Sequence, residues 1–149
     1  MGNRRMGLAR MEQLFEGLKR DLALGGATIS GEFMAVEAKA ASYAVSMPAD
    51  SGTTFTTTGA SGAVTFTLPT PSASIKGAHC YFFNTVDQNM VIAVTGNDAI
   101  VTLNDAAADT LTFGTSAEKI GASVHCVCDG SLWLAMDTSE NTITTTIAS

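Results

Sequence analysis

Short apolar runs separated by turn-forming residues fill the chain from residue 42 to its end, and this pattern constrains the fold more than any other feature. The runs are 42–47, 53–58, 63–68, 78–85, 90–95, 99–103, 110–115, 123–128, 132–137 and 142–147. The segments 59–62, 87–89, 96–98 and 129–130 lie between runs and contain the Gly, Asn and Asp residues that tight turns require. Many short strands at regular spacing predict a mainly-β fold, an antiparallel sandwich or barrel over residues 42–149.

Two of the turns carry specific predictions. Phe55 begins an alternation of apolar residues that Val64, Phe66 and Leu68 continue beyond the turn at 59–62, with threonines between them. Because alternate residues of a strand share one face, this predicts a hairpin that covers a core with one apolar face. The pair at 129–130, Asp-Gly between two apolar runs, is the strongest hairpin signal in the chain.

The front of the chain predicts an amphipathic helix, from about Met6 to Leu24, which ends at the glycine pair 25–26. Its apolar residues fall at alternating spacings of three and four, as in a coiled-coil seam; they are Leu8, Met11, Phe15, Leu18 and Leu22. A helix of this length is marginal in water alone, so its seam needs a partner. We therefore expect residues 1–26 to form a basic arm and an amphipathic helix, and residues 27–41 to form a connector.

Charge divides the chain in the same way. Arg4, Arg5 and Arg10 precede or begin the predicted helix, whereas Lys76 and Lys119 are the only basic residues after Ala40. Positive charge at a helix N-terminus opposes the helix dipole, so these arginines are either a solvated helix start or an anchor to an acidic surface. The acidic remainder argues against nucleic acid as a partner.

Cysteine content and the length of the apolar runs indicate the cellular compartment and whether the chain associates with a membrane. The cysteines number three, a poor basis for a disulfide framework, and the basic start continues into charged residues rather than an apolar signal segment. No apolar run approaches the roughly 20 residues that span a bilayer. We expect a protein made in a reducing cytoplasm, without a membrane partner.

Metal binding and catalysis are disfavoured by spacing. The dipeptide His-Cys occurs at 79–80 and 125–126, but in a strand Cys126 and Cys128 share one face while His125 points to the other. Four ligands therefore do not converge as a zinc site requires. Asp98, Asp105 and Asp109 lack the spacing of a calcium loop and are interpreted as turn residues, and nucleophile-elbow and phosphate-loop motifs are absent. We predict neither a cofactor nor an enzyme.

Several segments carry a resemblance to a family. They are 50–69, Asp-Ser-Gly-Thr-Thr-Phe-Thr-Thr-Thr-Gly-Ala-Ser-Gly-Ala-Val-Thr-Phe-Thr-Leu-Pro, then Gly77, 121–124 and 129–133. This pattern resembles the β-domain of capsid decoration (cement) and head-fibre proteins of tailed bacteriophages, and the opening residues 1–7 before a short helix are similar to the start of such proteins. The resemblance implies a small trimeric β-structure on the capsid surface.

Two functional hypotheses follow. The first is a structural virion protein on the outer capsid surface, a homotrimer that binds the major capsid protein; the helix is then either the seam of the trimer or a foot on the capsid. The alternative is a module of a head fibre or tail fibre that binds host surface glycans. Trp133 could stack on such a glycan, but a lone Trp between Leu132 and Leu134 is more often core or interface packing.

Overall fold

The computed structural model describes residues 7, 9–14, 33–96, 98–103, 105–114, 119–139 and 145–148. The chain separates into two units, Met1–Phe33 and Met34–Ser149. In the first unit residues 9–14 are helical, and the amides of Arg10 and Met11 donate to the carbonyl of Gly7 at 3.0 and 3.3 Å. A short N-terminal helix is thus confirmed, and its predicted continuation to Leu24 lies outside the described residues. None of the described helical residues forms a helix long and apolar enough to cross a membrane.

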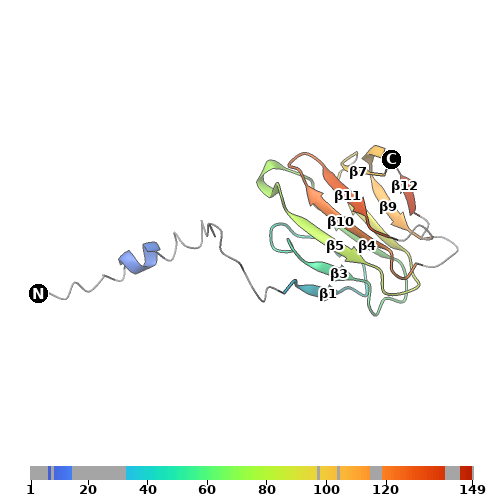
Figure 1. Ribbon diagram of the computed structural model, residues 1–149, viewed down its shortest axis with the longest axis horizontal. Helices are drawn as coiled ribbons and strands as arrows, with labels where there is room; N and C mark the ends of the chain where they lie inside the picture. The colour runs from blue at the N-terminus through green and yellow to red at the C-terminus, as the bar shows by residue number, and fades with distance from the viewer. Residues whose placement is uncertain are drawn as a thin grey trace, which may run out of the picture. The chain divides into compact units, whose positions relative to one another are not determined.

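The second unit is a sandwich of two sheets, which confirms the mainly-β class (Figure 1). Sheet A has the order β1-β3-β5-β10-β11-β7-β8, and sheet B has the order β12-β9-β6-β4-β2. The strands of sheet A are β1 (Val36–Ala38), β3 (Thr54–Thr56), β5 (His79–Phe83), β7 (Ile100–Thr102), β8 (Asp105–Ala108), β10 (Ser123–Cys128) and β11 (Trp133–Asp137). Those of sheet B are β2 (Tyr43–Ala44), β4 (Val64–Leu68), β6 (Met90–Val94), β9 (Thr110–Phe113) and β12 (Thr145–Ala148), and a 3-10 turn, η1 (Ala73–Ile75), precedes β5.

The core lies between the two sheets and is built from alternate residues of each strand. On β4 the side chains of Val64, Phe66 and Leu68 are fully buried, and the threonines between them are half-exposed. The ring of Phe66 lies 5.8 Å from that of Phe55 and 4.8 Å from that of Phe82, centroid to centroid, so aromatic rings from both sheets meet. Each such side chain contributes about 1.5–3 kcal/mol to stability when fully buried.

Strand direction differs from the prediction. The sheets are mixed rather than antiparallel: among the described strands, β1–β3, β3–β5, β2–β4, β4–β6 and β7–β11 pair in parallel. The reason for most of these pairs is that the chain crosses to the other sheet at each connection from β1 to β7. Strands β3 and β5 therefore become neighbours in sheet A with the same direction, and β4 and β6 do so in sheet B.

The hairpin predicted around the turn at 59–62 is accordingly wrong, although the alternation behind it is right. Phe55 on β3 and Phe66 on β4 are both fully buried, but they face each other from opposite sheets. The hairpin at 129–130 is confirmed, since β10 and β11 pair antiparallel and the amide of Asp129 donates to the carbonyl of Leu132 at 3.0 Å.

The β-unit also begins earlier than predicted. Strand β1 falls within residues 27–41, which were expected to be a connector, and it pairs in parallel with β3, with Val36 opposite Thr54. All three of its residues are exposed, so the strand contains no buried residue by which its sequence could have identified it. Its place at the edge of sheet A comes from backbone hydrogen bonds, such as Thr54 N to Ala35 O at 2.8 Å.

Candidate functional site

The outer face of sheet A, which points away from the core, is the most unusual surface of the β-unit. Two rows of register partners cross it: Val36, Thr54, Tyr81, His125 and Met136 in one, and His79, Val127, Leu134 and Val101 in the other, with Phe83 beside them on β5. None of these residues is Asp, Glu, Lys or Arg. Phe83, Leu134 and Met136 are 42 %, 37 % and 48 % exposed.

The outer face of sheet B has a different chemistry. Its register partners are Thr65, Val91 and Thr112 in one row and Thr67, Ala93 and Thr110 in the next. Threonine hydroxyls between small apolar groups suit a face that stays in water, because antiparallel and mixed sheets commonly keep one solvated side. The two outer faces of the sandwich are thus chemically unlike.

Two histidines and a tyrosine form a cluster at the centre of the outer face of sheet A. The rings of Tyr81 and His125 stack with centroids 3.9 Å apart and an interplanar angle of 6°. His79 meets His125 edge to face, with its Nδ1 3.3 Å from His125 Nε2. One of these nitrogens must donate and the other accept, so at least one of the rings is neutral. Burial, and then the neighbouring His79, lower the pKa of His125 below its ordinary value.

Trp133 lies in the core and not on a binding surface. It is fully buried on β11, and its Nε1 donates to the carbonyl of Pro69 at 2.8 Å. The indole thereby ties sheet A to the segment that follows β4 in sheet B. Of the two interpretations of this residue, the structure places it in packing, and a stacking role on a glycan would require it to leave the core.

The residues predicted for the helix seam and for capsid anchoring lie mostly outside the described residues. These are Leu8, Phe15, Leu18 and Leu22 of the seam, and Arg4 and Arg5 of the anchor. Arg10 and Met11 are described, and both are exposed on the helix of residues 9–14. Their roles as anchor and seam remain predictions.

The cysteines and histidines divide between the two faces of sheet A as the alternation predicted. Cys126 and Cys128 are buried toward the core, whereas His125, which precedes Cys126, is half-exposed on the outer face. The described part of the chain contains no cluster of three or more His, Cys, Asp or Glu residues that could hold a metal ion. Of the aspartates considered for calcium, Asp109 accepts the amide of Asp98 at 2.6 Å, a contact within the chain's own turns.

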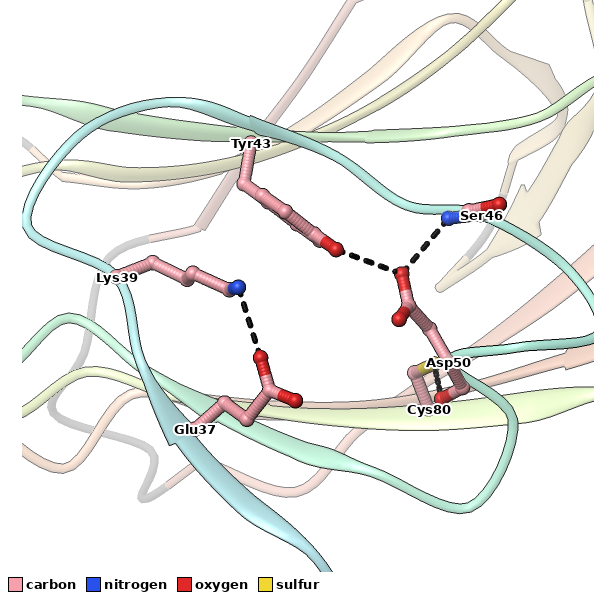
Figure 2. A network of polar contacts seen from close by, with 6 residues as sticks. All are labelled: Glu37, Lys39, Tyr43, Ser46, Asp50 and Cys80. Carbon is pink, nitrogen blue, oxygen red and sulfur yellow. Dashed lines mark hydrogen bonds and ion pairs between the residues drawn. The ribbon is translucent and has the colours of Figure 1, made fainter.

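A network of polar side chains joins the edge strands β1 and β2, which belong to different sheets (Figure 2). Lys39 Nζ lies 2.8 Å from a carboxylate oxygen of Glu37 and 3.7 Å from the centroid of the Tyr43 ring. The Tyr43 hydroxyl donates to Asp50 Oδ2 at 3.0 Å, and the amide of Ser46 donates to the same oxygen at 2.8 Å. We call these five residues the edge network.

The edge network is suited to holding the sandwich closed. The hydrogen bond with Glu37 raises the pKa of Lys39, and the hydrogen bond with Asp50 raises the pKa of Tyr43. Both shifts keep the protons where the contacts need them, on the ammonium and on the phenol. These contacts link the segment after β1 to β2 and to Asp50, and the arrangement thereby stabilises the fold.

Sequence reasoning missed the outer face of sheet A. The signal was present in β5 and β11, whose sequences, His-Cys-Tyr-Phe-Phe and Trp-Leu-Ala-Met-Asp, are apolar at both odd and even positions. Strands that are apolar on both sides are typical of sheets covered on both faces. In the described residues sheet A is covered only on its core side.

No protein-family model matches this chain, and no curated protein matches its sequence. Function is therefore inferred from the surface chemistry described above together with the resemblance carried by residues 50–69 and 129–133.

Proposed function

We propose that the protein is a structural virion protein, which decorates and stabilises the capsid of a tailed bacteriophage as a homotrimer. It is made in the host cytoplasm and acts on the outer capsid surface, and its partners are its own copies and the major capsid protein. Bridging neighbouring capsid subunits by several weak contacts at once requires no chemistry, only surfaces that bind.

The observation that carries this proposal is the uncharged outer face of sheet A. On a chain with a formal net charge of −6, a face that combines Phe83, Leu134 and Met136 and carries no Asp, Glu, Lys or Arg in its two rows is suited to protein contact. Exposed apolar side chains that gather on one face are typical of interaction sites on soluble proteins. The resemblance of residues 50–69 to decoration proteins supports a phage capsid as the setting.

The front of the chain supports a separate contact with the capsid. Arg10 and Met11 are exposed on the helix of residues 9–14, so one helical turn offers both a cation and an apolar side chain to a partner. A basic, amphipathic element complements an acidic capsid surface electrostatically, whereas the acidic β-unit does not.

Two measurements test the proposal. Light scattering on the purified full chain at tens of micromolar is expected to give the mass of three 15.4 kDa chains, about 46 kDa. Electron microscopy of virions that carry the protein is expected to show threefold-symmetric density on the capsid. A monomer in solution and on capsids contradicts the trimer, and density confined to the tail contradicts the decoration role.

Glycan binding is the alternative, and one observation favours it: Tyr81 and Phe83 place aromatic rings on the outer face of sheet A. Aromatic rings stack on the apolar faces of sugars, but Tyr81 already stacks on His125, which leaves less ring surface free. A glycan-array signal that disappears in Phe83→Ala, with capsid stability unchanged when the protein is absent, would favour this alternative over decoration.

A further inference from the structure

The two outer faces of the sandwich predict which surface brings copies together. Sheet B turns threonines outward, whereas sheet A turns aromatic, aliphatic and imidazole side chains outward from its central strands β5, β10 and β11. The apolar side chains of sheet A that remain in water do not contribute the favourable free energy that burial of apolar area provides. The core side of this sheet is already covered, so its outer side is the face that still gains from a cover.

The size of the outer face of sheet A suits an interface between proteins. Six of its strands carry the two rows of register partners. Strands spaced by about 4.8 Å, with about four residues each at about 3.3 Å, give a flat area of about 400 Å². This flat area, which protruding side chains enlarge, is about half of the roughly 800 Å² that each partner buries in a standard interface.

Charge favours another copy of this chain as the occupant. Each copy carries a formal net charge of −6, so copies repel through most of their surface and can approach closely only where charge is absent. The outer face of sheet A meets that condition on both sides of such a contact. Nδ1 of His79 and Nε2 of His125 already form a hydrogen bond at 3.3 Å. An apolar partner therefore leaves neither of these two nitrogens without a hydrogen-bond partner.

We propose that the outer face of sheet A, centred on His79, Tyr81 and His125, is the surface through which copies of this chain associate. This inference rests on the proposed homotrimer and names its contact surface. Three copies that each turn this face toward a common axis form a closed assembly, with the threonine face of sheet B left in water.

A pair of matched variants tests the surface. Met136→Glu adds one negative charge on the outer face of sheet A, and Thr67→Glu adds the same charge on the outer face of sheet B. Met136 is 48 % exposed within the described chain and Thr67 is half-exposed, so both variants are expected to fold, which circular dichroism and thermal melting verify. Sedimentation velocity on the full chain then reports the mass of each protein.

The outcomes separate this inference from the proposed function. A trimeric parent, a trimeric Thr67→Glu and a monomeric Met136→Glu support the proposed surface. If parent and both variants are trimeric, the homotrimer stands and the outer face of sheet A is not its seam. If Met136→Glu is trimeric but no longer binds capsids, the face contacts the capsid instead, which also overturns the inference. A monomeric parent overturns both the homotrimer and its contact surface.

Acid provides a second test, because a contact centred on His79 and His125 must exclude charged imidazoles. The other groups that face this pair are Tyr81 on β5, Thr54 on β3, and Leu134 and Met136 on β11, none of which supplies a compensating negative charge. A free histidine side chain is mostly neutral at pH 7.5 and mostly charged at pH 5, and a charged imidazole is unfavourable in an apolar contact. Association of the parent is expected to weaken between these pH values, and association of the double variant His79→Gln, His125→Phe much less. Equal association of the parent at both pH values overturns the proposed centre.

Discussion

Asn84 is the side chain whose replacement should damage the β-unit most selectively. It is fully buried, its Nδ2 donates to the carbonyls of Gln88 and Lys119 at 2.8 and 3.0 Å, and its Oδ1 accepts the hydroxyl of Thr57 at 2.5 Å. The amide therefore joins the end of β3, the loop after β5 and the segment before β10. Asn84→Asp keeps the size and shape of the side chain and removes both donors.

The magnitude of the effect follows from the two carbonyls. Each buried acceptor that loses its donor costs about 1–3 kcal/mol, so the ionised variant should lose about 2–6 kcal/mol of unfolding free energy. A loss of about 4 kcal/mol lowers Tm on the order of 15 °C for a unit of this size. Because burial disfavours the ionised form, the pKa of the new carboxyl should rise in the folded state. The deficit is then largest above that pKa and shrinks as the pH falls below it, when a protonated carboxyl can donate to one carbonyl again.

Urea unfolding at pH 8 and pH 4.5, followed by the fluorescence of the buried Trp133, measures this deficit as the difference between variant and parent at each pH. Gln88→Glu is the matched control, since it makes the same amide-to-acid change four residues away on a half-exposed side chain. We expect Asn84→Asp to be far less stable than Gln88→Glu at pH 8, and to recover part of the difference at pH 4.5. Equal stabilities of the two variants at both pH values would refute the assignment of Asn84 as the junction of these segments.

Three further predictions concern protons and thiols. Because the folded pKa of His125 lies below its ordinary value, the unfolded chain binds this proton more readily; stability should be full above pH 6.5 and fall as the pH drops through the folded pKa, and His125→Phe should flatten that slope in urea titrations. Burial raises the pKa of the Cys80 thiol to about 12 and also raises that of Cys126, and the Cys128 side chain is buried as well. A thiol reagent at pH 8 should therefore leave the folded chain unmodified and label the three cysteines only in denaturant; labelling of the folded chain would contradict this. Tyr43→Phe removes one hydrogen bond to Asp50 and leaves that of Ser46, so it should cost about 1 kcal/mol in thermal or urea unfolding, and an unchanged midpoint would show that the hydroxyl contributes nothing.

The sequence was informative where one residue's burial depends on its own strand. Alternation placed Phe55, Val64, Phe66 and Leu68 on a buried face, and all four are fully buried. It also placed the cysteines of β10 inward and His125 outward. Such predictions succeed because the period of two along a strand is fixed by backbone geometry and does not depend on which strand lies beside it.

Strand pairing could not be obtained in the same way. Gly59 has a φ of 87°, the conformation that a tight turn between two strands of one sheet also requires. The same residues therefore suit a turn that returns within a sheet and a turn that crosses to the opposite sheet. Which of the two forms is decided by packing between distant segments, such as the contact of Phe66 with Phe82, and not by the turn itself.

The outer face of sheet A could not be predicted from the sequence for a related reason. Tyr81, Phe83 and Met136 lie in the predicted strands 78–85 and 132–137, but the sequence assigned them to neither face, because apolar residues at successive positions indicate burial without saying what covers each face. Once β5 and β11 are placed in the centre of sheet A, their inward residues account for the core and their outward residues remain. A chain that turns threonine outward on one sheet and imidazole, phenyl and thioether groups outward on the other has two faces that suit different neighbours. Water suffices for sheet B; for sheet A the proposed neighbour is a second copy of the same uncharged face.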